Sequence, residues 1–313
     1  MICAFTFPGQ GSQMVGMGKA LAAAEPAARA VFAEVDEALG APLSRLMFEG
    51  PEETLRLTEN AQPALLAVSM AVVRSLEARG VGVVDAARYV AGHSLGEYSA
   101  LAAAGALSVP DAARLLRLRG QAMQRAVPVG EGAMAALLGL DFDEAKAVAE
   151  AAAQGEVCAP ANDNAPGQVV VSGHKAAVER AMMLAKEKGA RRAVLLPVSA
   201  PFHCPLMQPA AAEMADALAV THIAPPCVPL IANVTAAPVS EPETIRKLLV
   251  EQVTGVVRWR ESVAWLARAG VTLVAELGAG KVLSGLAKRI DGGLATLAVH
   301  EPDDIAILLK AMA

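Results

Sequence analysis

The chain has 313 residues, enough for one large domain or two modest ones, and 54% of them are hydrophobic against 19% charged. This composition excludes a disordered chain, because it supplies ample apolar surface for a packed core. The net charge of −5 argues against a protein that grips nucleic acid through general electrostatics. The four cysteines are far apart without a CxxC pair, which is typical of a reduced compartment and not of a disulfide framework or zinc site.

The sequence indicates a protein of the cytoplasm. Its first residues contain neither a basic leader nor a long apolar run, so we expect no signal peptide. The longest apolar helical stretch, residues 63–73, is too short to cross a bilayer. We therefore expect no membrane association.

Strands and helices alternate along most of the chain, which predicts a parallel sheet covered by helices. A short strand at residues 2–7 ends in Pro8-Gly9-Gln10-Gly11, a run that must turn. Pro63 is expected in the first turn of its helix, and Asp111 is expected to cap another. Further strands are expected at residues 89–91, 228–233 and 272–277, and helices at 20–39, 60–79, 98–105 and 111–125.

The pattern changes between residues 128 and 198. The expected order there is strand, helix, strand, strand, helix, strand, which is the split βαβ or ferredoxin-like arrangement. We therefore predict a core domain of residues 1–127 and 199–313 that carries a small inserted domain at 128–198. The expected strands of the insert are residues 132–140, 157–162, 168–172 and 192–196, and its helices are 141–153 and 174–188.

The most informative motif is Gly92-His93-Ser94-Leu95-Gly96, a G-x-S-x-G sequence between an expected strand and an expected helix. This context is typical of a nucleophile elbow. The sharp turn needs glycines without Cβ atoms at both ends, and it lifts the Ser94 hydroxyl clear of the sheet. The amide of Leu95 and the helix dipole then favour negative charge on a carbonyl oxygen. The alternative is an ordinary serine in a glycine turn, which the flanking elements make less favourable.

A serine nucleophile needs a base, and histidine is the natural choice near neutral pH. His203 follows the last strand of the insert, where the returning chain should pass over the cleft between the two domains. Its position makes it the best candidate. His93 is adjacent to Ser94, so its side chain should leave the turn in another direction and pack or hydrogen-bond elsewhere. The other histidines are His174, His222 and His300.

Two glycine-rich loops fail as nucleotide-binding motifs. In the first, at residues 7–14, Met14 takes the place of the third glycine of a dinucleotide loop. In the second, at residues 277–282, Val282 replaces the Ser or Thr that would hold magnesium. The first loop still follows a strand and can supply a second oxyanion donor.

Taken together, the motifs resemble the malonyl-CoA:acyl carrier protein transacylases of bacterial type II fatty acid synthesis over essentially the whole chain. The resemblance implies a hydrolase-like α/β core with a ferredoxin-like insert, which agrees with the organisation above. The matching segments are residues 7–13, 62–64, 92–97, 118–120, 123–124, 162, 166–170, 202–203, 252, 257–259 and 276–283.

The resemblance also implies residue roles. Ser94 matches the nucleophile and His203 its general base, while the backbone amides of Gln10 and Leu95 match the oxyanion hole. Gln252 stands in the region that orients the histidine, so no acidic triad member is expected.

Arg119 matches the residue that binds the free carboxylate of the malonyl group, a task that suits the two parallel donors of a guanidinium. Without the resemblance, Arg119 would be read as a surface arginine on a basic helix.

The implied reaction is ping-pong transfer of malonyl from coenzyme A to acyl carrier protein, with no metal and no cofactor. Because the carrier is typically acidic, we expect a basic docking patch, with Lys288, Arg289, Arg191 and Arg192 as candidates. Solvated surface charge is the equally weighted alternative for these four residues. A discrete acyltransferase of polyketide synthesis, a serine thioesterase or hydrolase, and a non-catalytic scaffold of the same fold stay open as alternative functions.

Overall fold

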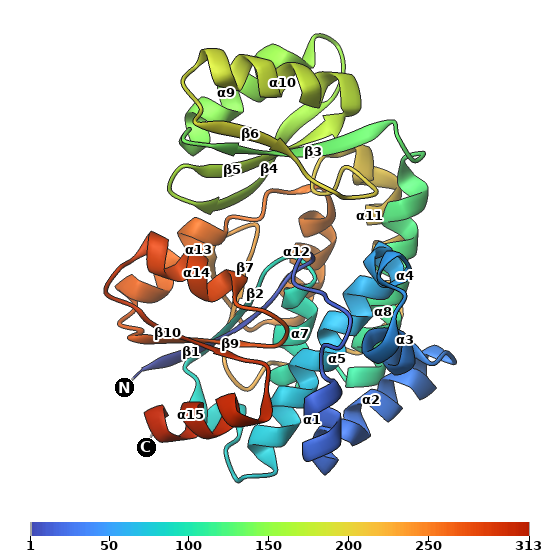
Figure 1. Cartoon of the computed structure of the whole chain (residues 1–313), viewed down its shortest axis with the longest axis vertical. Coiled ribbons are helices and arrows are strands. Elements are labelled where there is room, and N and C mark those ends of the chain that lie inside the picture. The colour runs from blue at the N-terminus through green and yellow to red at the C-terminus, as the bar shows by residue number, and fades with distance from the viewer. Residues whose placement is uncertain (1, 313) are drawn as a thin grey trace.

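The computed structural model describes residues 2–312, which form two β-sheets and their covering helices (Figure 1). The strands are β1 (Cys3–Phe7), β2 (Tyr89–Gly92), β3 (Gly132–Leu138), β4 (Cys158–Ala165), β5 (Gln168–His174), β6 (Arg192–Leu195), β7 (Leu230–Ala232), β8 (Ala237–Val239), β9 (Leu273–Leu277) and β10 (Ala295–Val299). The helices are α1 (Lys19–Ala24), α2 (Pro26–Leu39), α3 (Leu43–Glu49), α4 (Glu52–Arg56), α5 (Thr58–Glu77), α6 (Val83–Ala86), α7 (Gly96–Ala103), α8 (Val109–Ala126), α9 (Phe142–Ala153), α10 (Lys175–Glu187), the 3₁₀ helix η1 (Pro205–Met207), α11 (Gln208–Val220), α12 (Pro242–Thr254), α13 (Trp259–Arg268), α14 (Val282–Ile290) and α15 (Pro302–Met312).

The larger sheet has the strand order β10-β9-β1-β2-β7-β8, and its first five strands are parallel. Only β8, which forms a hairpin with β7, runs antiparallel. Successive side chains of a strand point to opposite faces, so β1 contributes to two cores. Phe5 and Phe7 pack with helices α2, α5 and α8, whereas Ala4 packs with α13 and α14 on the other face. The predicted parallel sheet with helices on both faces is confirmed.

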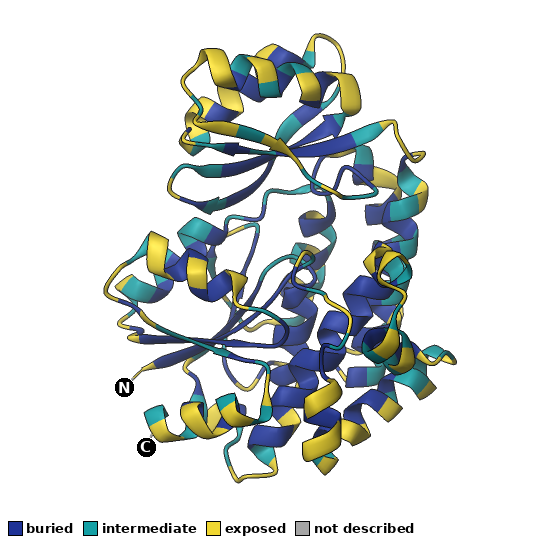
Figure 2. Cartoon of the chain, in the orientation of Figure 1, coloured by how far each residue is buried: buried dark blue, intermediate teal, exposed yellow. Residues whose placement is uncertain are grey.

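The smaller sheet has the order β4-β5-β3-β6 and is antiparallel throughout. Helices α9 and α10 cover the face that points away from the larger sheet (Figure 1). Their outward sides are exposed, and so is the edge strand β6, whereas β3, β4 and β5 are largely buried (Figure 2). This arrangement confirms the ferredoxin-like insert in a hydrolase-like α/β fold. We keep residues 128–198 as the proposed limits of the insert.

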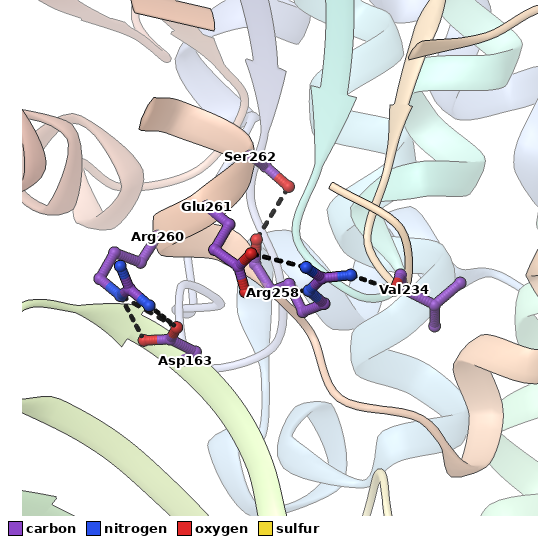
Figure 3. Close-up of polar contacts among 6 residues, drawn as sticks. All are labelled: Asp163, Val234, Arg258, Arg260, Glu261 and Ser262. Carbon is purple, nitrogen blue, oxygen red and sulfur yellow. Dashed lines mark hydrogen bonds and ion pairs between the residues drawn. The ribbon is translucent and has the colours of Figure 1, made fainter. Parts of the chain in front are cut away.

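The two parts of the chain are joined where β4 meets the segment between α12 and α13. Asp163 N donates to the Val257 carbonyl and Val257 N donates to the Ala161 carbonyl, both at 2.9 Å. The Arg260 guanidinium binds both carboxylate oxygens of Asp163 (Figure 3), with its Nη2 2.8 Å from Oδ2. The smaller sheet is thus held directly above the segment that follows Gln252.

Three helix boundaries differ from expectation. The helix expected at residues 20–39 is broken at Glu25, because Pro26 begins α2 as its first residue and cannot continue the preceding helix. Helix α5 starts at Thr58, so Pro63 lies inside it and not in its first turn. Helix α8 is capped by Ser108, whose hydroxyl accepts from the Asp111 amide at 3.1 Å. The expected cap at Asp111 is therefore wrong: Asp111 lies in the first turn of α8, and the Ser108 hydroxyl satisfies its amide.

Across residues 2–312, every helix falls short of the length or the apolar character needed to cross a bilayer.

Candidate active site

Ser94 stands at the turn between β2 and α7, at the carboxyl end of the parallel strands. A Cβ atom on Gly92 would lie 1.9 Å from the carbonyl oxygen of Gly96, and one on Gly96 would lie 2.3 Å from that of Phe7. The turn therefore requires glycine at both positions, as expected of an elbow. Ser94 itself adopts a φ of 54°, in the left-handed region that side chains rarely occupy. Its hydroxyl is thus presented where the helix begins.

His203 lies in the segment that returns from the smaller sheet, and its imidazole reaches Ser94. The Ser94 Oγ and His203 Nε2 atoms are 2.7 Å apart. On the other side of the ring, Nδ1 is 2.8 Å from the main-chain oxygen of Gln252, which can only accept a hydrogen bond. Nδ1 therefore carries the ring proton, and Nε2 is free to accept the proton of the Ser94 hydroxyl.

The electrostatic surroundings keep this imidazole neutral. Burial is the larger cause and the neighbouring charge of Arg119 the next, and together they lower the pKa of His203 to about 3. At neutral pH the ring is therefore an unprotonated base in contact with a hydroxyl, which is the arrangement that nucleophilic catalysis by serine requires.

Arg119 projects from α8 into the same site, and its side chain is almost fully buried. Its Nη2 atom donates to Ser94 Oγ at 3.1 Å and to Gln252 Oε1 at 2.8 Å, while Nη1 donates to Gln62 Oε1 at 2.8 Å. Its Nε–H has no hydrogen-bond partner among residues 2–312. None of the ion pairs in this part of the chain includes Arg119. A buried guanidinium that makes no ion pair and keeps an unpartnered N–H has donors with which it can bind an anionic group.

The amides of Gln10 and Leu95 both belong to residues that line the cavity at Ser94. Neither amide donates a hydrogen bond to another residue within 2–312. The Gln10 loop is fixed by its side chain, whose Oε1 accepts from the Thr58 hydroxyl at 2.9 Å. Leu95 precedes the first turn of α7, where amides have no partner within the helix. Both donors are therefore free to bind an oxyanion.

The cavity has a volume of about 320 Å³, within the range of small-molecule sites. The larger domain contributes Gln10, Ser94 and Arg119 to its walls, and the β3 and β4 strands of the smaller sheet contribute Met134 and Asn162. The site thus lies between the two parts of the chain, as the sequence predicted for the returning segment. No group of three or more His, Cys, Asp or Glu in residues 2–312 is placed to hold a metal ion.

His93 points away from the catalytic pair, as expected from its place in the turn. Its Nε2 atom is 2.8 Å from Asn164 Oδ1 of β4, and its ring centroid is 5.7 Å from that of Trp259. The histidine therefore ties the elbow to the smaller sheet.

The four candidate docking residues are all exposed, at two separate places. Arg191 precedes β6 and Arg192 begins it, while Lys288 and Arg289 lie in the last turn of α14. Arg289 is already engaged with the smaller sheet, because it donates to the Gln168 side chain and to the Pro166 carbonyl, the latter at 3.2 Å.

Three buried polar residues of the site were not singled out from the sequence. Gln62 and Glu97 belong to motifs that carried the resemblance, but nothing in those motifs assigned them a contact. Asn233 follows β7, and its Oδ1 accepts from the Ser94 amide at 2.8 Å. The signal that could have found it is that Asn233 ends a strand of the parallel sheet, because the carboxyl ends of such strands share one edge.

Comparison of this chain with known proteins shows which family it belongs to. The family model of the acyl transferase domain matches residues 4–286. A malonyl CoA-acyl carrier protein transacylase of Bacillus subtilis is 48% identical over 310 residues, which cover 99% of this chain and 96% of the relative. The chain belongs to the malonyl CoA-acyl carrier protein transacylases.

Solved structures of this family superpose on nearly the whole chain. The acyl-carrier-protein S-malonyltransferase of Bartonella henselae is 56% identical with a TM-score of 0.98, over 100% of this chain and 99% of that one. A malonyl-transacylase solved in complex with its type II PKS acyl-carrier protein is 44% identical with a TM-score of 0.96, over 99% of this chain and 100% of that one. The family resemblance inferred from the motifs is confirmed.

Proposed function

We infer that the chain is an [acyl-carrier-protein] S-malonyltransferase, which moves malonyl from coenzyme A to the phosphopantetheine thiol of acyl carrier protein in fatty acid biosynthesis. The observation that carries this assignment is the contact of Arg119 with Ser94 Oγ at 3.1 Å. A buried guanidinium at the nucleophile favours an acyl group that bears its own carboxylate. Malonyl has this carboxylate one carbon from the thioester carbonyl, close enough for both groups to be held at once.

In the first half-reaction, the Ser94 oxygen attacks the thioester carbonyl carbon of malonyl-coenzyme A while His203 Nε2 takes the hydroxyl proton. The carbonyl oxygen becomes an oxyanion, and the free amides of Gln10 and Leu95 stabilise it. The C–S bond then breaks with its electron pair on sulfur, and His203 returns the proton to the coenzyme A thiolate. The product is malonyl-Ser94 and free coenzyme A.

The second half-reaction runs the same steps in reverse. His203 takes the proton of the carrier's phosphopantetheine thiol, and the resulting thiolate attacks the ester carbonyl of malonyl-Ser94. The C–O bond breaks, and His203 returns the proton to the Ser94 oxygen. The enzyme is restored and the malonyl thioester of the carrier leaves.

The bound carboxylate also affects the base. The positive charge of Arg119 is the second cause of the low pKa of His203. A malonyl carboxylate paired with Arg119 offsets that charge, so substrate binding raises the pKa of His203 and makes it a stronger base. Acyl groups without a carboxylate do not provide this effect.

Intact mass spectrometry after mixing with malonyl-coenzyme A tests the assignment. The wild type should gain one malonyl group that maps to the Ser94 peptide and persists until a thiol acceptor is added. The Ser94→Ala variant should gain nothing. A serine thioesterase or hydrolase would instead release malonate and coenzyme A continuously without an acceptor. A malonyl group on Ser94→Ala would exclude this serine as the nucleophile.

We propose that acyl carrier protein approaches the exposed basic residues Lys288, Arg191 and Arg192, with Arg289 available only if it leaves Gln168. Charge reversal of Lys288 together with Arg192 should raise the KM for the carrier and leave the KM for malonyl-coenzyme A unchanged. An unaltered carrier KM would place the docking surface elsewhere.

Transfer to a carrier of polyketide synthesis is the second candidate. The malonyl-transacylase solved in complex with a type II PKS acyl-carrier protein has a structure similar to that of this chain. The transfer chemistry is the same in fatty acid synthesis and in polyketide synthesis. Comparison of kcat/KM for purified carriers of the two classes distinguishes them.

A further inference from the structure

Glu97, the second residue of α7, is a buried titratable group that the proposed mechanism leaves unused. Its side chain is 1% exposed, and it does not line the cavity, so it acts only through its neighbours. Oε1 accepts from the Asn233 amide at 2.6 Å, and Oε2 accepts from the Gln252 side-chain Nε2. Burial raises the pKa of Glu97 to about 8, although these two hydrogen bonds and the charge of Arg119 lower it. A pKa of about 8 would leave this carboxyl mostly protonated at pH 7, but both oxygens face N–H donors and neither faces an acceptor for a carboxyl proton, so the hydrogen-bond geometry is that of the ionised form.

The Gln252 side chain lies between hydrogen-bond acceptors on one side and a hydrogen-bond donor on the other. Its Nε2 atom donates to Glu97 Oε2 and, at 2.8 Å, to the Ser94 carbonyl oxygen, while its Oε1 accepts from Arg119 at 2.8 Å. An ionised carboxylate can only accept, and a guanidinium can only donate. The amide of Gln252 can therefore satisfy all three contacts in one orientation and not in the flipped one.

We propose that Glu97 is a positioning residue, which fixes the amide orientation of Gln252 and so aims the Arg119 guanidinium at the carboxylate of the acyl group. The inference rests on the proposed function, because it assigns Glu97 a part in choosing malonyl over acyl groups without a carboxylate. Glu97 acts through Gln252 and makes no contact with substrate.

Replacement of Glu97 by glutamine isolates this role. The main-chain N–H of Asn233 can only donate, so the carbonyl oxygen of the new side chain must face it, and the new NH₂ group must face Gln252. Gln252 then either opposes one NH₂ with another or flips. In the flipped state it presents NH₂ to the donors of Arg119 and its oxygen to the Ser94 carbonyl. The first outcome pushes the Gln252 amide out of place, and the second takes its Oε1 away from Arg119, so in both the acceptor that orients Arg119 is no longer held in position.

The experiment measures acylation of Ser94 by malonyl-coenzyme A and by acetyl-coenzyme A, each followed by intact mass. In Glu97→Gln the malonyl rate should fall about ten- to hundredfold more than the acetyl rate, the range expected for a misplaced charge-assisted contact. Glu97→Asp keeps an acceptor-only group, so its malonyl-to-acetyl ratio should stay closer to that of the wild type. Thermal unfolding of each variant shows whether the protein is folded.

Glu276→Gln provides the matched control. Glu276 is also buried, and its two oxygens also accept from two N–H groups, those of Leu283 at 3.0 Å and Ser284 at 2.7 Å. It touches neither Gln252 nor Arg119, so this variant should lose stability and keep the wild-type malonyl-to-acetyl ratio.

Two results overturn the proposal. One is an equal loss of both acylation rates in Glu97→Gln, and the other is the same malonyl-to-acetyl ratio in the Gln and Asp variants. Failure of the proposed function is distinct, because the wild type and Glu276→Gln would then both fail to form malonyl-Ser94.

Discussion

Ser94 and His203 meet at 2.7 Å, and the backbones of both residues lie in the left-handed region, with φ values of 54° and 57°. Each such conformation costs on the order of 1–3 kcal/mol for a residue with a side chain. The surrounding fold sustains both, because Ser94 sits between two obligatory glycines and His203 is almost fully buried. The strain is thus stored in the two residues that exchange the proton.

The glycine before the elbow should tolerate no side chain. In Gly92→Ala the new Cβ would lie 1.9 Å from the Gly96 carbonyl oxygen, which is main chain and cannot move aside. We expect a loss of at least about 4 kcal/mol in the free energy of unfolding, or no folded protein, measured by urea denaturation.

Gly285→Ala is the control for this substitution. Gly285 lies within α14, and a Cβ atom added there would meet no neighbouring atom within 4 Å. Alanine should therefore stabilise the protein by about 0.5–1 kcal/mol, through its higher helix propensity. Similar losses in both alanine variants would contradict the account of the elbow.

Arg119→Ala should separate binding of the carboxylate from acyl chemistry. The variant loses the donors that hold the malonyl carboxylate, so acylation by malonyl-coenzyme A should fall about a hundredfold while acylation by acetyl-coenzyme A is retained. Arg114→Ala on the same helix removes an exposed arginine paired with Asp111 and should change neither rate. Equal losses for malonyl and acetyl donors in Arg119→Ala would reject its proposed role.

The sequence predicted the two sheets and the Ser94–His203 pair because these depend on local patterns and on the order of the elements along the chain. Glycines 92 and 96 indicate an elbow because a strand precedes them and a helix follows, and alternating strands and helices predict a parallel sheet. The returning segment at His203 was placed by its position after the insert. These inferences need chain order and backbone geometry only.

The sequence could not predict contacts that depend on the packing of distant segments. Gln62, Glu97 and Asn233 lie on three separate segments of the chain, and their hydrogen bonds to the site join residues up to 155 positions apart. The burial of Arg119 was missed although the spacing of α8 carried it, because Arg119 follows the buried Ala112, Leu115 and Leu116 at helical intervals whereas Arg114 lies on the exposed face. The break at Pro26 was visible in the sequence, but the apolar pattern around it is that of a continuous helix.

His203 should make the protein less stable in acid. The folded state keeps this residue neutral down to about pH 3, whereas the unfolded chain protonates it near 6.5, so between these values the unfolded state binds more protons. Lowering the pH from 7 to 5 should therefore cost about 2 kcal/mol through His203 alone. His203→Gln cannot take up this proton, so its free energy of unfolding should fall correspondingly less between pH 7 and pH 5. Urea denaturation at both pH values measures the difference, and equal losses in the two proteins would contradict it.

The Asp163–Arg260 ion pair should stabilise the junction between the two sheets more than the nearby Arg258–Glu261 ion pair stabilises α13. The Asp163 side chain is 2% exposed and Arg260 contacts both of its oxygens, whereas Arg258 and Glu261 are each 37% exposed and pair within one helical turn (Figure 3). In Asp163→Asn a buried charge-assisted contact is lost, so we expect a loss of about 1–3 kcal/mol in urea denaturation. Glu261→Gln should cost at most about 0.5 kcal/mol, because an exposed pair on one helix contributes little. Comparable losses in the two variants would show that the ion pair to β4 adds nothing to the junction beyond an ordinary surface contact.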